Sequence, residues 1–167
     1  MKLELLKEND PQLLEVSESW DFEVDGDPAQ LVHYMVDLLG ARGGVGLAAP
    51  QCGVKKRIFL MGVPENFTVC INPMIVSISD ERVMDLEGCL SFPELWMKVK
   101  RPAAVVVKYQ TVSGEEVETS LFGMQSRIFL HEYDHLIGIT FDQRVGDLTL
   151  KMAKDKRKKF LKSLPKL

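Results

Sequence analysis

The stretch HEYDH, at residues 131–135, constrains this chain more than any other part of the sequence. Residues four apart lie on the same face of an α-helix, so His131 and His135 can bind one metal ion through their imidazoles. Glu132 lies beside them, where it can accept a proton from water on that ion. Apolar residues flank the motif and predict a largely buried helix: Ile128, Phe129, Leu130, Leu136 and Ile137. Because buried polar groups need partners, a metal site is favoured over two surface histidines.

A third ligand must come from elsewhere, because two histidines leave a catalytic metal site one protein ligand short. No histidine follows His135, and the nearest later carboxylate, Asp142, is too close to the helix end to fold back easily. Upstream, Cys89 lies in the segment LEGCLSFP, in a strand-end or turn setting whose backbone can approach a site closely. A thiolate is a good ligand for zinc or iron(II), so Cys89 is the predicted third ligand.

The number of cysteines and the N-terminal segment indicate the cellular compartment in which the protein is expected. The chain has three cysteines, an odd number that argues against a disulfide framework. Cys52 and Cys70 are alternative ligands, but each is expected to be a buried small residue. Residues 1–16 mix charged residues with leucines and lack the apolar stretch of a signal peptide, and no run is long enough to span a membrane. A cytoplasmic location, or an equivalent reducing compartment, is expected.

A second functional segment is GGVGLAAPQ, at residues 43–51. It is glycine-rich, but it lacks the Lys-Ser/Thr of a phosphate-binding loop and follows a helix instead of a strand. Its small residues, among them Gly46, Ala48 and Ala49, allow the backbone to approach a substrate edge-on. Gln51 has an amide donor suited to a developing oxyanion.

Periodicity predicts helices within residues 27–44, 124–138 and 146–164. The first begins with Asp27 as N-cap and Pro28 at the first helical position, and His33 within it is expected to be a packed or surface residue.

Between these helices, residues 57–63 and 68–78 form β-like runs broken by Pro64 and Pro73, and residues 103–123 predict a hairpin that turns near Ser113–Gly114. The expected fold is α+β, with short antiparallel strands packed around a central helix carrying HEYDH, an N-terminal helix and a C-terminal helix. A single domain over residues 1–167 is expected at this length.

Charge is distributed unevenly along the chain. Residues 151–167 carry eight basic residues and one acid, a net charge of +7, whereas residues 1–150 carry a net charge of −10. A basic tail on an acidic body indicates an anionic partner such as nucleic acid. A solvated helix face is the alternative interpretation.

Three stretches, in the right order, resemble the motifs of the peptide deformylase family. The family pattern G-x-G-L-A-A-x-Q matches Gly44–Gln51, the pattern E-G-C-L-S matches Glu87–Ser91, and Q-H-E-x-D-H is matched over His131–His135. The similarity extends over nearly the whole chain. It implies a metal-dependent hydrolase that removes the N-formyl group from the N-terminal formyl-methionine of newly synthesised proteins and releases formate.

The resemblance also implies roles for individual residues. Three residues would bind the metal, with water as the fourth ligand: Cys89, His131 and His135. Glu132 would act as the general base and then as the acid toward the leaving amine, while the Gln51 side chain and the Leu90 backbone N–H would stabilise the oxyanion. The family usually uses iron(II), with zinc, nickel or cobalt able to replace it, although zinc normally binds such ligands more tightly than iron(II) does.

Further residues are implied to bind the peptide or to support the metal ligands. The Val45–Gly46 backbone would pair with the extended peptide as an added strand. The other implied substrate-binding residues are Gly88, Leu90 and Trp96, and the implied supporting residues are Glu87, Arg101 and Asp134. Arg101 is expected to pair with Glu87.

Two positions depart from the family pattern. Leu130 replaces a glutamine, and Trp96 stands where many bacterial members carry an arginine near the substrate. An aromatic side chain at position 96 would shape the pocket differently, unless it only packs on its loop.

The basic C-terminal helix, residues 150–167, corresponds to the helix that docks on the ribosome in bacterial members. Such docking would use phosphate contacts without base reading, and neither membrane binding nor sequence-specific DNA binding is expected. Three alternatives remain at this point: a general metallopeptidase, a non-enzymatic ribosome-associated relative, and a structural metal protein. A general peptidase would need a carboxylate or histidine as third ligand, a binding module has no need of Glu132, and a structural site would need a fourth ligand.

Overall fold

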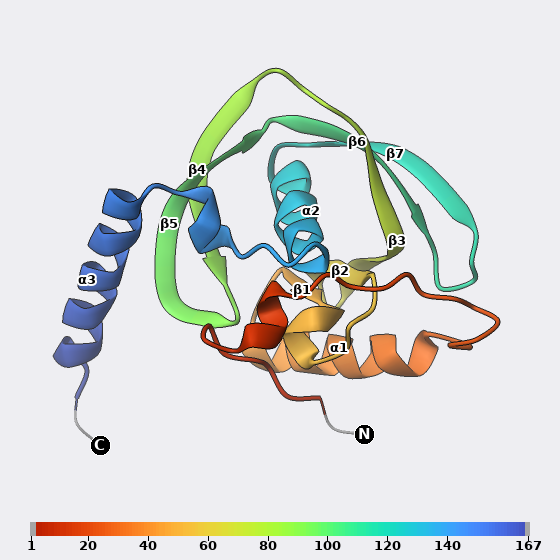
Figure 1. The fold of residues 1–167 in the computed structure, drawn as a ribbon, viewed down its shortest axis with the longest axis horizontal. Coiled ribbons are helices and arrows are strands. Elements are labelled where there is room, and N and C mark those ends of the chain that lie inside the picture. Colours follow the sequence, from red (N-terminus) through yellow and green to blue (C-terminus); the bar gives the residue numbers. More distant parts are fainter. Residues whose placement is uncertain (1–2, 166–167) are drawn as a thin grey trace.

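The computed structural model describes residues 3–165, in which seven strands form two antiparallel sheets (Figure 1). The larger sheet has the strand order β1-β2-β3-β6-β7, and β4 and β5 pair with each other. The strands are β1 (Gly46–Ala48), β2 (Ile58–Val63), β3 (Asn66–Ile78), β4 (Arg82–Cys89), β5 (Phe92–Pro102), β6 (Ala104–Gln110) and β7 (Glu116–Phe122). Strand β5 shows the expected alternation, since Leu95, Met97 and Val99 are buried while the residues between them are exposed.

Helix α2 (Gly123–Leu136) carries the HEYDH motif through the middle of the molecule, as expected. Figure 1 shows it enclosed by strands of both sheets, and it contacts β1, β2, β5, β6 and β7. Phe129 packs edge-on against Phe59 of β2, with ring centroids 5.1 Å apart. Leu130, which replaces the family's glutamine, is buried in the same apolar cluster and needs no polar partner there. The predicted α+β class and the central position of this helix are confirmed.

Helix α1 (Ala29–Arg42) covers one side of the larger sheet through Val32, Met35 and Leu39, which are buried. It begins one residue later than predicted, because Pro28 occupies the N-cap position. The Asp27 side chain nevertheless accepts a hydrogen bond from the Ala29 N–H at 2.9 Å. His33 is exposed on this helix and pairs with Asp37 across one turn, so it lies outside any metal site.

Pro73 does not end a strand, and this part of the sequence-based prediction is wrong. β3 continues from Asn66 to Ile78, and its pairing with β6 shifts register between Ile71 and Met74. Asn72 takes a positive φ of 50° at this irregularity. A bulge accommodates proline because its residues need not supply every N–H of the ladder. As a result, β3 is 13 residues long, and the strands are not all short.

Helix α3 (Asp147–Ser163) lies beside β5 at the edge of the molecule (Figure 1). It begins three residues before position 150 and ends at Ser163, and residues 166–167 of the predicted segment lie outside the described residues. Leu150 and Ala153 pack against the apolar cluster around Phe92 and Phe141. None of the helices in residues 3–165 is long and apolar enough to cross a membrane.

Candidate metal centre

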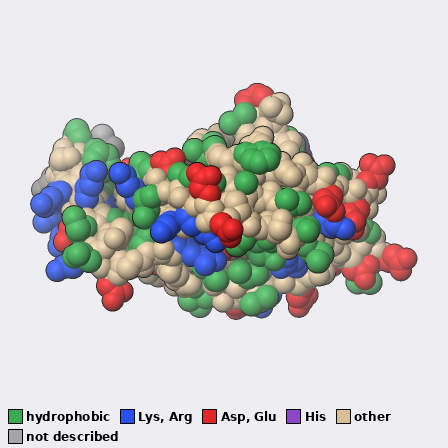
Figure 2. All heavy atoms as spheres, turned by 90° about the horizontal axis from the view of Figure 1, so that it is seen from above, with side chains coloured by type: hydrophobic (Ala, Val, Ile, Leu, Met, Phe, Trp, Pro, Cys, Tyr) green, Lys and Arg blue, Asp and Glu red, His purple; other side chains and the backbone are tan. Residues whose placement is uncertain are grey.

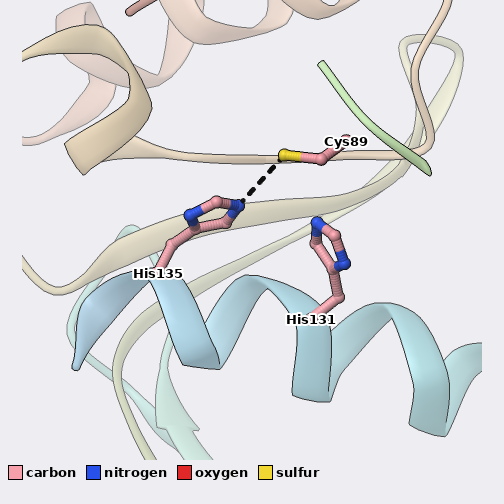
Figure 3. A group of neighbouring side chains, drawn as sticks. All are labelled: Cys89, His131 and His135. Atoms are coloured by element: carbon pink, nitrogen blue, oxygen red, sulfur yellow. Dashed lines mark hydrogen bonds between the residues drawn. The ribbon is translucent and has the colours of Figure 1, made fainter. Parts of the chain in front are cut away.

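Three donors from distant parts of the chain converge at one point (Figure 3). Cys89 ends β4, whereas His131 and His135 lie one turn apart on α2. One ligand atom from each residue lies within 4.8 Å of the other two, and the Cys89 Sγ is 3.4 Å from the His135 Nε2. The cysteine predicted as the third ligand therefore lies beside the predicted histidines.

This arrangement fits a single metal ion. Metal–nitrogen and metal–sulfur bonds of about 2.0 and 2.3 Å place donors on a tetrahedral ion roughly 3.5 Å apart. The observed separation of 3.4 Å between the Cys89 and His135 donors matches that value. One thiolate and two imidazoles suit zinc or iron(II), and three protein ligands leave one position open.

Glu87 sets the orientation of the His131 ring. Its Oε2 lies 3.0 Å from the His131 Nδ1. Burial alone would raise the pKa of the Glu87 carboxyl, but hydrogen bonds from His131 and Arg101 lower that pKa to about 2. An ionised carboxylate only accepts hydrogen bonds, so Nδ1 donates and the Nε2 of a neutral ring keeps its lone pair for a metal.

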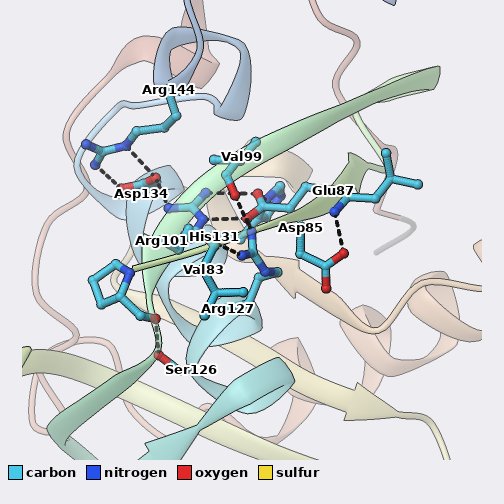
Figure 4. A network of polar contacts seen from close by, with 12 residues as sticks. Val83, Asp85, Glu87, Val99, Arg101, Ser126, Arg127, His131, Asp134 and Arg144 are labelled. Atoms are coloured by element: carbon cyan, nitrogen blue, oxygen red, sulfur yellow. Dashed lines mark hydrogen bonds and ion pairs between the residues drawn. The ribbon is translucent and has the colours of Figure 1, made fainter. Parts of the chain in front are cut away.

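Arginines surround Glu87 and connect it to Asp134 (Figure 4). Arg101 donates from Nε and Nη2 to the two Glu87 oxygens at 2.5 and 3.0 Å, which is the pair expected from the sequence. Its Nη1 donates to Asp134 at 2.9 Å. On the other side, Arg127 donates to Glu87 at 2.7 Å and to two backbone carbonyls of β4 and β5.

Two residues of this network, Arg127 and Arg144, were missing from the sequence-based prediction. For Arg127 a signal existed, because it lies four residues before His131 and so shares its helix face. A charged residue on the buried face of an apolar helix needs a buried partner. Arg144 carries no such signal, because its partner Asp134 becomes known only once the chain has folded.

Glu132 is almost fully buried and lines the same cleft as Cys89 and His131. Burial raises the pKa of its carboxyl to about 7. Its Oε2 has no hydrogen-bond partner among the described residues, which indicates that a further polar group belongs in front of it. The other oxygen lies against Gly46, where any Cβ would collide with the carboxylate. This contact is a specific reason for glycine at position 46.

The amide of Gln51 is fixed with its donors toward the metal centre. Gln51 lies in the short helix η2 (Ala49–Cys52), and its Oε1 accepts from the Ala48 N–H at 2.9 Å. Its Nε2 is then 3.4 Å from the Cys89 Sγ and 3.2 Å from the Ser91 Oγ. Because the Oε1 is held by the Ala48 N–H, the amide N–H groups of Gln51 face the space beside the Cys89 sulfur.

A cleft of about 530 Å³ leads to these groups from the surface. It is lined by Cys89, His131, Glu132 and Gln51, and by all five residues predicted to bind the peptide: Val45, Gly46, Gly88, Leu90 and Trp96. The Trp96 ring lies over Gly88, where a Cβ would be only 2.6–2.8 Å from the indole. Trp96 is 57% exposed and lines the cleft.

The alternative ligands Cys52 and Cys70 do not belong to the metal centre. Both are buried within apolar clusters, as expected, and neither is part of the group formed by Cys89 and the two histidines. Burial raises the pKa of the Cys52 thiol to about 12 and raises the pKa of the Cys70 thiol as well. Both thiols therefore stay protonated, and a protonated thiol is a poor metal ligand.

Comparisons with known proteins agree with these features. The model of the family described as polypeptide deformylase matches residues 2–151. The peptide deformylase of Thermotoga sp. strain RQ2 is 40% identical over 122 residues, which cover 73% of this chain and 74% of that protein.

Two solved structures are also similar to this chain. A peptide deformylase of Synechococcus elongatus in complex with actinonin has a TM-score of 0.87 and 32% identity, covering 93% of this chain and 86% of that chain. A Met-Ala-Ser-bound peptide deformylase of Acinetobacter baumannii has a TM-score of 0.81 and 34% identity, covering 87% of this chain and 99% of that chain.

Proposed function

Since the chain belongs to the peptide deformylase family, we propose that the cleft at Cys89, His131 and His135 is its active site. The chain is a metal-dependent hydrolase that removes the N-formyl group from the N-terminal formyl-methionine of newly synthesised proteins and releases formate. The observation that carries the assignment of the site is the convergence of one thiolate and two imidazoles beside a buried carboxylate at the floor of a cleft.

The three donors, Cys89, His131 and His135, would hold the metal. When bound, such an ion polarises a carbonyl and makes water a nucleophile near neutral pH. We propose iron(II) as the native ion, with zinc, nickel or cobalt able to replace it. The donor set supports any of these ions, because sulfur and imidazole nitrogen bind all of them.

Glu132 is positioned to move the proton. Its buried carboxylate, with a pKa raised to about 7, can take a proton from the attacking water and return it to the leaving amine nitrogen. A Cβ at position 46 would collide with this carboxylate, so the glycine leaves the carboxylate room beside the metal centre. The Gln51 Nε2 and the Leu90 backbone N–H would stabilise the negative charge that develops on the formyl oxygen.

The Gln51→Ala variant is expected to lower kcat by roughly 100- to 1000-fold, the usual loss for one oxyanion donor. Metal content should not change, because Gln51 contacts the thiolate from the side and is not a ligand. Formate release and metal analysis on the same preparation check both parts. A variant that loses its metal would assign Gln51 to the support of Cys89 instead.

The peptide would lie along β1, which is an edge strand of the larger sheet and borders the cleft. An edge strand offers unpaired backbone groups to an extended chain, so Val45–Gly46 would pair with the substrate. The related Acinetobacter baumannii structure holds Met-Ala-Ser, which is a peptide of the kind proposed here. Trp96, on the rim, would contact residues that follow the methionine.

The direct test is formate release from formyl-Met-Ala-Ser by protein purified and metal-loaded without oxygen, with Met-Ala-Ser as the comparison peptide. Formate from the first peptide and no cleavage of the second supports deformylation. Cleavage of the unformylated peptide would instead support a general metallopeptidase, although the thiolate ligand Cys89 argues against that class. No turnover of either peptide would favour a non-enzymatic relative.

The basic helix α3 would dock on ribosomal RNA. Figure 2 shows Lys and Arg side chains gathered over α3, at the end of the molecule. The exposed lysines of α3 are Lys151, Lys154, Lys156, Lys158, Lys159 and Lys162. We also propose a cytoplasmic location or an equivalent reducing compartment, because Cys89 must stay reduced to bind the metal.

Changing Lys158 and Lys162 to glutamate is expected to weaken ribosome binding. In a plot of log affinity against log salt concentration, the slope should become shallower by about one for each phosphate that the helix no longer neutralises. Changing the exposed Lys7 and Lys55 to glutamate is the control with the same change in charge. Co-sedimentation with ribosomes over a salt series measures both. Equal affinity of the two double variants at every salt concentration would refute docking through α3.

A further inference from the structure

We propose that Arg144 is a positioning residue for the metal centre, acting through Asp134 and Arg101 on the Glu87–His131 pair. This inference rests on the proposed function only in that it concerns the same metal site. Figure 4 shows Arg144 at the outer end of a continuous chain of polar contacts that runs inward from Asp134 to Glu87.

Arg144 holds Asp134 with both arms of its guanidinium. Its Nε donates to the Asp134 Oδ2 at 2.9 Å, and its Nη2 donates to Oδ1 at 2.5 Å. A planar guanidinium facing a carboxylate in this way fixes the rotation of the carboxylate as well as its position. Asp134 directly precedes the metal ligand His135 and is itself buried.

Asp134 in turn shares Arg101 with Glu87. The Asp134 Oδ2 accepts from the Arg101 Nη1, while Nε and Nη2 of Arg101 are used by Glu87. Without Arg144, the buried Oδ1 of Asp134 loses its cation, and Arg101 becomes the only charged partner left to that carboxylate among the described residues. Asp134 would then compete with Glu87 for Arg101, and the carboxylate that orients His131 would be held less firmly.

Arg144 lies where its side chain contributes little to the packing of the core. It ends the short helix η3 (Phe141–Arg144), outside the cleft, and its side chain is 41% exposed. Water can therefore take the space of a removed side chain, so the fold is expected to survive the substitution. Water cannot supply the fixed positive charge that Arg144 places beside Asp134. Without that charge, Asp134 has only Arg101 as a cationic partner among the described residues.

The chain offers a matched control in Arg157. Like Arg144, it comes from the C-terminal part of the chain and pairs through two nitrogens with a carboxylate on the body, here Glu8 at 3.1–3.3 Å. Neither Arg157 nor Glu8 contacts the network around Glu87. An effect that comes only from loosening the C-terminal segment should appear in the Arg157→Ala variant too.

The experiment compares wild type, Arg144→Ala, Arg144→Lys and Arg157→Ala, each loaded with cobalt. Residues that support a metal ligand typically change metal affinity 10- to 100-fold, so Arg144→Ala is expected to bind cobalt roughly 10-fold more weakly, at the low end of that range. Its cobalt absorption spectrum should shift, because the His131 ring is held less firmly. Arg144→Lys should recover only part of the affinity, since lysine does not bind both oxygens in a plane.

Arg157→Ala is expected to match wild type in affinity and spectrum. The KM for formyl-Met-Ala-Ser should also stay unchanged in Arg144→Ala, because Arg144 does not line the cleft. Wild-type affinity and spectrum in Arg144→Ala would overturn the proposal, as would an equal loss in Arg157→Ala. Cobalt binding is measured without substrate, so a wild-type protein that released no formate would defeat the proposed function and leave this test intact.

Discussion

Replacing Glu132 with glutamine is expected to lower kcat for formyl-Met-Ala-Ser by roughly 100- to 10,000-fold, the usual contribution of a positioned general acid–base group. Glutamine has nearly the same shape, so it keeps the contact with Gly46 and the surrounding packing. It cannot accept the proton of the attacking water, nor can it return one to the leaving amine. The loss should therefore appear in kcat, with little change in KM.

Metal analysis and a control variant show whether the loss of activity comes from proton transfer alone. Metal analysis should show the same occupancy in Glu132→Gln and wild type, because Glu132 is not among the three converging donors. The matched control is Glu94→Gln, since Glu94 lines the same cleft but is exposed and should tolerate loss of charge. A Glu132→Gln enzyme within about 10-fold of wild-type kcat would lie outside the range for such a group and would remove Glu132 from proton transfer.

Replacing Cys89 with alanine is expected to weaken metal binding by more than about 100-fold, because even residues that only support a ligand change affinity 10- to 100-fold. Activity should fall with metal content. Two imidazoles from one helix remain, but the sulfur that faces them across the site is gone. Metal analysis after dialysis, together with loss of the cobalt–thiolate absorption band, measures the effect.

The control for this variant is Cys52→Ala. It removes a thiol of the same size from the core, where burial raises the pKa of Cys52 to about 12 and keeps it protonated. This variant should retain its metal even if it unfolds at a lower temperature. Full metal occupancy in Cys89→Ala would exclude Cys89 as the third ligand, and equal metal loss in both variants would point to a general effect on the fold.

The sequence predicted the parts of the site that depend on local spacing. His131 and His135 share a helix face in any α-helix, so their pairing required no knowledge of the fold. The burial of α2 followed from its apolar neighbours. Pro73 shows the limit of the same reasoning, because the bulge that accommodates it depends on pairing with β6, a strand about 30 residues away in sequence.

Contacts between distant segments required the tertiary structure. Cys89 was chosen from three cysteines by its chemistry and by family resemblance, but its approach to His135 spans 46 residues. The hydrogen bond between Glu87 and His131 spans 44 residues, and that between Gln51 and Cys89 spans 38.

By itself, the sequence determined which residue types were available and which of them share one helix face, because these properties depend on composition and on the helical repeat. Only the tertiary structure decided that β4 ends against α2, that Gly46 lies under Glu132, and that Arg144 reaches Asp134. The physical reason is that such contacts form only when whole elements pack together. Their free energy depends on the shape and burial of both partners, which no local pattern encodes.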